Sequence, residues 1–198
     1  MSSRNALRSD PNGAHARIYR TVTSSPAWRV LSWSARALYV DLRAKVTGTN
    51  NGNINATLSE LKHVGWRSPS TLSRALYELQ ALGFLVKTRG GGVEFGSKVC
   101  ALYCFTDLEV FDQPKQGVKA MKATHAHVTY KTIAEAMKAK QEGMGRMRAE
   151  AIERKQRAKA RKKTTLQKTT SDAIEAVAMG RFDATQSVQE RSPSLQNV

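Results

Sequence analysis

Apolar residues recur at helical spacing in two stretches of the chain. The first covers residues 35–46 and is preceded by Ser34, a predicted N-cap. The second opens with Ser68-Pro69, a cap followed by a first-turn proline, and ends before Gly83. One face of each stretch is apolar and predicts an amphipathic helix against a core: Leu38, Tyr39, Leu42 and Val46 in the first, and Leu72, Ala75, Leu76 and Leu79 in the second.

Shorter elements flank these helices. Ile54 predicts a short strand, and Thr57-Leu58-Ser59-Glu60 fits a capping box that starts a helix ending at Gly65. After Gly83, residues 84–88 and 99–106 are β-rich and enclose a glycine-rich turn and a longer tip. This arrangement predicts a β-hairpin.

The polar face of the second amphipathic helix suits a nucleic-acid groove. Its small hydroxyl side chains allow close approach and can bond phosphates or base edges, and an arginine can bond guanine through two atoms. The hairpin adds basic residues near its tip. The candidate contacts are Arg67, Ser68, Ser70, Thr71, Ser73, Arg74 and Tyr77 on or before the helix, and Lys87, Arg89 and Lys98 on the hairpin.

The order helix, short strand, helix, turn, helix and hairpin resembles the winged helix-turn-helix superfamily. The string S-x-S-T-L-S-R-A-L-x-E-L-x-x-L-G-F-L, which begins at Ser68, is similar to the recognition helix and wing entry of many bacterial, plasmid and phage proteins. The resemblance covers residues 53–106 and implies an α+β, mainly α, fold. It implies helix 69–82 in the major groove and a wing, residues 84–106, on the backbone or minor groove. The long tip, residues 90–98, departs from the simplest wings.

Positive charge is concentrated behind this region. The chain has a net charge of +16, and residues 115–168 contain 16 basic and only 4 acidic side chains. Residues 131–163 are rich in helix formers but have a thin apolar stripe, which predicts an exposed, partly helical extension. Its basic run favours non-specific contact with a polyanion through Lys155, Arg157, Lys159, Arg161, Lys162 and Lys163.

The sequence therefore predicts five segments. They are a basic N-terminal arm at 1–13, a winged helix-turn-helix domain at 14–107, a linker at 108–130, the basic helical extension at 131–163 and a mostly disordered tail at 164–198.

Other residue types give no sign of catalysis or metal binding. Cys100 and Cys104 are interpreted as reduced, buried thiols, and Trp28, Trp33 and Trp66 as mostly core or helix-seam residues. The pair His125 and His127 lacks nearby carboxylates or cysteines for a metal. Signatures of nucleotide hydrolases, serine hydrolases and metalloproteases are missing, so we expect no enzyme, cofactor or metal.

These patterns predict a sequence-specific protein that binds double-stranded DNA, first of all a transcriptional regulator. The alternatives are a plasmid or phage replication initiator or organiser that binds origin repeats, a general nucleic-acid-binding protein, and a protein-interaction adaptor. A homodimer and a protein partner of the C-terminal tail stay open. The sequence has no apolar run long enough for a membrane span and no secretory signal, so we expect a cytoplasmic, nucleoid-associated protein.

Overall fold

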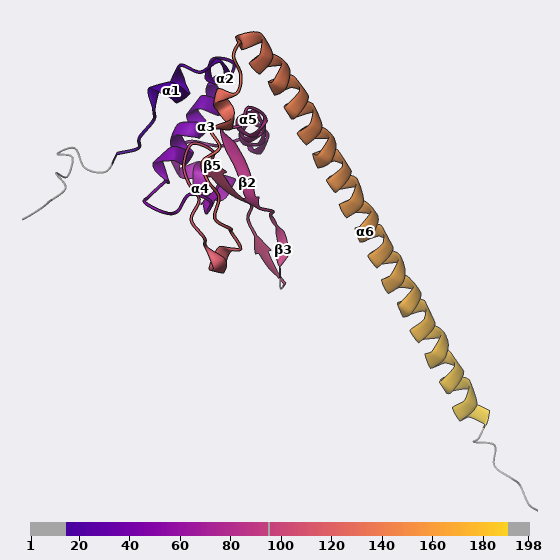
Figure 1. The fold of residues 1–198 in the computed structure, drawn as a ribbon. Coiled ribbons are helices and arrows are strands. Elements are labelled where there is room, and N and C mark those ends of the chain that lie inside the picture. The colour runs from indigo at the N-terminus through magenta and orange to yellow at the C-terminus, as the bar shows by residue number, and fades with distance from the viewer. Residues whose placement is uncertain (1–14, 95, 190–198) are drawn as a thin grey trace, which may run out of the picture. The chain divides into compact units, whose positions relative to one another are not determined.

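The computed structural model describes residues 15–94 and 96–189 and has an α+β fold with more helix than strand (Figure 1). The predicted N-terminal arm, residues 1–13, lies outside the described residues. The chain divides into two compact units, Met1–Met147 and Arg148–Val198. Helix α6 (Ile133–Gln189) passes from the first unit into the second.

The helices of the first unit precede most of its strands. They are α1 (Arg20–Thr23), α2 (Pro26–Arg29), α3 (Trp33–Ala44), α4 (Leu58–Leu61), which the 3-10 turn η1 (Lys62–Val64) extends, and α5 (Pro69–Ala81). Both predicted amphipathic helices are present as α3 and α5, and their leucines are buried. None of the helices in the described part of the chain could span a membrane.

Local capping differs from two of the sequence predictions. The hydroxyl of Ser32, rather than that of Ser34, accepts the Ala35 backbone N–H at 3.2 Å, so α3 begins two residues early. The capping box at Thr57 is also wrong, because Glu60 instead binds the Nζ of Lys45 at 2.8 Å. The Lys45 ammonium, which comes from a distant segment, binds the Glu60 carboxylate that the local pattern assigned to the backbone N–H of Thr57.

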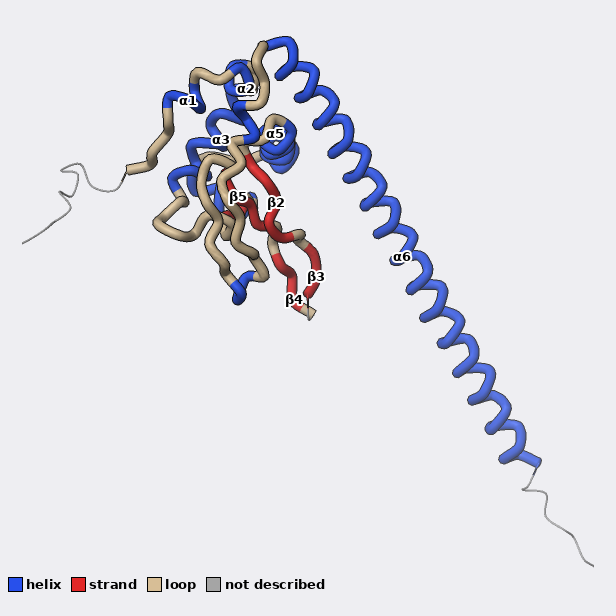
Figure 2. The backbone as a smooth tube through the Cα atoms, viewed as in Figure 1, coloured by secondary structure: helices blue, strands red, loops and turns tan. Residues whose placement is uncertain are grey.

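The main sheet is antiparallel, with strand order β1-β5-β2. Its strands are β1 (Ile54–Asn55), β2 (Leu85–Arg89) and β5 (Leu102–Phe105). The predicted hairpin is present, but the long tip forms a separate two-stranded ladder of β3 (Gly92–Glu94) and β4 (Ser97–Val99) (Figure 2). The β2–β5 ladder itself contains an irregularity between Lys87 and Arg89.

Aromatic rings join the helices to the sheet. Tyr39 of α3 packs edge to face on Phe105 of β5 at 5.1 Å, on Trp28 at 5.2 Å and on Phe84 at 5.7 Å between ring centroids. Such pairs add about 0.5–1.5 kcal/mol each beyond burial of their apolar area. The sheet therefore gives α3 and α5 a fixed support.

Residues 108–130 do not form the plain linker that the sequence predicts. Val110 pairs with Met121 and Gln113 with Val118, and the two valines are buried against Leu102 and Cys104. The sequence does not indicate this hairpin, because a hairpin with only two buried apolar side chains has almost no alternating pattern of apolar and polar residues. The packed unit thus extends beyond the predicted boundary at 107.

The C-terminal helix is longer than predicted. It begins at Ile133 and runs to Gln189, through residues that the composition assigned to a disordered tail. Once a helix is nucleated, each added residue gains one backbone hydrogen bond, so helix can continue through a polar stretch. Its first turns belong to the first unit, where Ala136 is fully buried.

Candidate nucleic-acid interface

Helix α5 has two chemically distinct faces. Leu72, Ala75 and Leu79 are buried, whereas Ser73 and Arg74 between them lie at the surface. Arg74 has 71% of its side chain exposed. The other sequence-predicted contacts of this face also reach solvent: Ser70, Thr71 and Ser73 are exposed, and Tyr77 is half-buried.

Glu78 is the single acidic residue of α5, and it is completely buried. Its Oε2 atom accepts the Ser32 backbone N–H at 2.9 Å and lies 2.9 Å from the Nζ of Lys140 on α6. Its Oε1 atom lies 3.6 Å from the Nε of Arg74, an ion pair too long for a hydrogen bond. One carboxylate of α5 therefore contacts two other parts of the first unit, the cap of α3 and the start of α6.

The charge of Glu78 is compensated where it is buried. Burial favours the neutral acid, but the Ser32 N–H and the Lys140 ammonium outweigh that effect and lower the pKa of the carboxyl. Glu78 is therefore ionised at neutral pH and paired inside the protein. The solvent-facing side of α5 consequently has hydroxyls and a guanidinium but no carboxylate.

The N-terminal end of α5 is fixed by a hydroxyl cap. The Oγ of Ser68 accepts the Thr71 N–H at 3.3 Å and lies 2.9 Å from the Oγ of Ser70. Ser68 is therefore engaged within the protein, whereas Arg67 is exposed. Both residues were predicted as contacts, and the structure gives Ser68 a structural task as well.

An open cavity of about 590 Å³ lies beside this end of the helix. It is lined by Leu58, Ser59, Lys62, His63, Trp66 and Arg67. Trp66 is held in place because its Nε1 donates to Asp41 at 2.7 Å. Lys62 and His63 were not among the predicted contacts, although their position at the end of the short helix before the turn was a usable signal.

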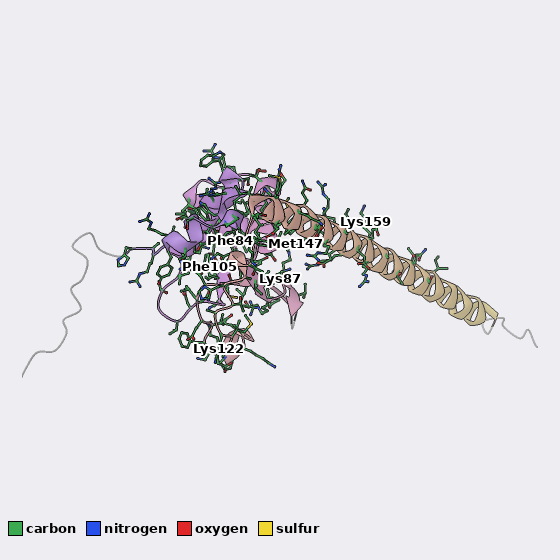
Figure 3. The ribbon with its side chains drawn as sticks, turned by 45° about the horizontal axis from the view of Figure 1, so that its top comes forward. Phe84, Lys87, Phe105, Lys122, Met147 and Lys159 are labelled. Atoms are coloured by element: carbon green, nitrogen blue, oxygen red, sulfur yellow. The ribbon has the colours of Figure 1, made fainter. Side chains whose placement is uncertain are left out.

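The two hairpin lysines and Arg89 have different surroundings. Lys87 on β2 and Lys98 on β4 are exposed (Figure 3 shows Lys87). Arg89 is half-buried and donates to the backbone oxygen and Oε1 of Gln116, both at 3.3 Å, and to the Cys100 oxygen at 3.4 Å. Arg89 therefore joins segments of the protein and is a weaker candidate for contact with a ligand.

The basic extension is described only in part. Lys155, Arg157 and Lys159 are exposed on α6, and Arg157 pairs with Glu153 one turn earlier. The side chains of Arg161, Lys162 and Lys163 lie outside those that the structure describes. The described part of the extension is thus a helix with solvent-facing cations.

Trp33 differs from its predicted place in the core or a helix seam. Its side chain is 83% exposed, and the guanidinium of Arg36 lies 4.9 Å from its ring centroid. Its position at the first turn of α3, outside the apolar stripe, explains why the core does not cover it. Trp66 is buried and Trp28 is partly buried, as the sequence predicts.

His127 and Cys104 are buried and contribute to packing, whereas Cys100 is half-buried. His127 is buried and stacked on Phe84 at 5.1 Å, and burial lowers its pKa so that the neutral ring is favoured. Cys100 and Cys104 are free thiols, and burial raises the pKa of Cys104. Within the described residues no group of three or more histidine, cysteine or acidic side chains is placed to hold a metal ion.

Comparisons of the chain with protein-family models, with curated proteins and with solved structures found no match.

Proposed function

We propose that this protein binds double-stranded DNA with sequence preference and acts as a transcriptional regulator. The observation that carries the proposal is the face of α5. This helix exposes Ser70, Thr71 and Arg74, while its one carboxylate, Glu78, is buried and paired with Lys140. A helix with this surface can enter a major groove without bringing a negative charge to the phosphates.

The order of elements supports a winged helix-turn-helix reading of the fold. Helix α4 with η1, a turn at Gly65 and helix α5 precede the antiparallel β2–β5 pair. Gly65 has a φ of 102°, which suits the sharp turn between the two helices. In this proposal α5 is the recognition helix, and the β2–β5 pair with its β3–β4 tip is the wing.

Each proposed contact has a distinct task. Arg74 reads a base edge, and Ser70, Thr71 and Ser73 bond phosphates or bases at close range. Arg67, Lys87 and Lys98 hold the backbone. The cations of α6 beyond Met147 add affinity without sequence preference, because exposed lysine and arginine side chains contact any phosphate chain.

The test is selection of duplexes from a random-sequence pool by the full-length protein, followed by competition. We expect a recurrent motif, and we expect the selected duplex to compete far better than a scrambled duplex or than RNA of the same length. Equal competition by all three would instead indicate a general nucleic-acid-coating protein and refute the proposal.

The position of the selected motif in the source genome then separates regulation from replication. One or two motifs over a promoter support a transcriptional regulator. An array of repeats beside an AT-rich segment would make the protein an origin binder and would overturn the regulatory role while keeping DNA binding.

A further inference from the structure

A second hairpin projects from the end of the domain that also bears the β3–β4 tip (Figure 2). We name residues 110–121 the 110–121 hairpin. Val110 and Met121 exchange both backbone hydrogen bonds, at 2.8 and 2.9 Å, and Gln113 and Val118 form the next such pair at 2.9 and 3.3 Å. The short turn η2 (Pro114–Gln116) closes it. The proposed function gives this hairpin no task.

The 110–121 hairpin is firmly anchored to the loop before β1. The side-chain amide of Asn51, buried in this loop, donates to the oxygens of Leu108 and Glu109 at 3.0 and 3.2 Å. Next to it, Gly52 has a φ of 102°, and a Cβ there would lie 2.7 Å from Val110. Only glycine therefore allows the hairpin to seat at this distance.

Arg89 ties the 110–121 hairpin to the proposed wing. Its guanidinium donates to the backbone and side chain of Gln116, across the turn of the hairpin. An open groove of about 440 Å³ lies between the two, lined by Arg89, Gly90, Gly91, Gly92, Val93, Val99 and Gly117. Four of these seven residues are glycines, so the walls are largely bare backbone that an extended chain could approach closely.

Exposed lysines lie on or next to both elements that flank this groove. On the wing side, Lys98 is exposed and pairs in register with the lining residue Val93. On the hairpin side, Lys115 lies in the closing turn and Lys122 directly follows the hairpin, and both are exposed (Figure 3 shows Lys122). Lys119 is exposed too, but the register Gln113–Val118 places it opposite Asp112, which offsets its charge.

We propose that the groove between the wing and the 110–121 hairpin seats one sugar-phosphate strand of the DNA duplex. Lys98 contacts phosphates from the wing, and Lys115 and Lys122 contact them from the hairpin. The occupant is a phosphodiester backbone because both flanking elements carry exposed lysines, four of the seven lining residues are glycines and the groove is too open to enclose a small molecule. This inference rests on the proposed function, to which it adds a second, sequence-independent anchor.

The experiment compares two double variants of the full-length protein on the selected duplex. Lys115→Gln with Lys122→Gln removes both hairpin cations. Lys131→Gln with Lys138→Gln removes two exposed lysines elsewhere in the first unit and is the matched control. Since each phosphate contact contributes about 0.9 to the slope of log K against log[salt], we expect the hairpin variant to flatten the slope by about 1.8. The control keeps the parent slope.

Two further readouts make the result specific. In hydroxyl-radical footprinting, the hairpin variant should lose protection of one strand at the edge of the site, while protection over the motif remains. Asp112→Asn should release Lys119 and steepen the salt slope by up to about 0.9.

The outcomes separate the two proposals. If the parent binds no duplex, the proposed function and the groove contact both fail. If it binds duplexes without preference, the proposed function fails, and the salt slopes of the variants still test the groove contact. If the parent binds its motif but the hairpin variant matches the control in slope and footprint, only the groove contact is refuted.

Discussion

Lys140 of α6 and Glu78 of α5 form an ion pair with a separation of 2.9 Å, and the same ammonium donates to the Val30 oxygen at 2.8 Å. The carboxylate is completely buried and Lys140 is 20% exposed. The first turns of α6 are thereby fixed to the inner side of the proposed recognition helix. At its start, α6 is therefore part of the same packed unit as α5.

Lys140→Met should destabilise the fold by about 3 kcal/mol, because a buried carboxylate that loses its cation is left poorly compensated. Urea unfolding of the full chain measures the change. Lys138→Met alters an exposed residue of the same helix and should stay within about 0.5 kcal/mol of the parent. Equal stabilities of the two variants would contradict the role of the pair.

Gly143→Ala and Gly145→Ala should change the thermal stability in opposite directions. A Cβ at Gly143 would lie 2.7 Å from the Cβ of Ala81 on α5, whereas a Cβ at Gly145 meets nothing within 4 Å. Alanine gains about 1 kcal/mol in helix propensity at either position. At Gly143 overpacking of about 1–3 kcal/mol outweighs that gain, so thermal unfolding should show a lower Tm there and a higher Tm for Gly145→Ala.

Arg74→Ala should remove most of the discrimination between the selected motif and a scrambled duplex and leave the fold intact, since the side chain is mostly exposed. Loss of a two-atom contact to guanine corresponds to about 1–3 kcal/mol. Competition binding measures it, and Arg29→Ala, at an exposed arginine of α2, is the control. Unchanged discrimination in Arg74→Ala would exclude this arginine from base reading.

Stability should fall as the pH drops below about 6.5 because of His127. Burial lowers the pKa of the folded ring below its ordinary value of 6.5. Below that pH the unfolded chain binds the proton and the folded chain does not, so the unfolding free energy decreases by up to about 1.4 kcal/mol per pH unit until the folded pKa is reached. Denaturant unfolding between about pH 7.5 and about pH 5 measures this decrease in the unfolding free energy. His127→Phe should flatten the dependence, and His63→Gln, at an exposed site, should not.

Neutralising the basic extension should change affinity but not site choice. Lys155→Gln with Lys159→Gln removes two exposed cations of α6. The salt slope should flatten by up to about 1.8 while the ratio of specific to scrambled binding stays constant. Titration at several salt concentrations with both duplexes tests this, and a falling ratio would mean that the extension takes part in reading the sequence.

The main helices and the hairpin were predictable because their signals are local. The leucine stripe of α5, its Ser68 cap and the β-rich runs are confirmed as helix, cap and strands. Two of the failures depended on distant partners. Glu60 binds Lys45, and the 110–121 hairpin is joined to Asn51, whose backbone oxygen accepts the side-chain amide of Gln113.

The candidate site also combines features that have local sequence signals with features that depend on distant partners. The exposed face of α5 could be read from helical periodicity alone, since buried leucines fix which side faces solvent. The burial of Glu78 could not, because its partners are the backbone of Ser32 and the side chain of Lys140. The hydrogen bond from Arg89 to Gln116 could not be predicted either, because it requires the second hairpin. Periodicity shows which side is inside but not which charges meet there.

The order in which the ribosome makes these residues delays completion of the ion pair behind α5. Glu78 emerges 62 positions before Lys140, which at about 5–20 residues per second is an interval of about 3 to 12 s. During that interval the carboxylate has the Ser32 N–H but not its ammonium. The packed core of the first unit is therefore not electrostatically complete until the start of α6 has been synthesised and has docked against α5.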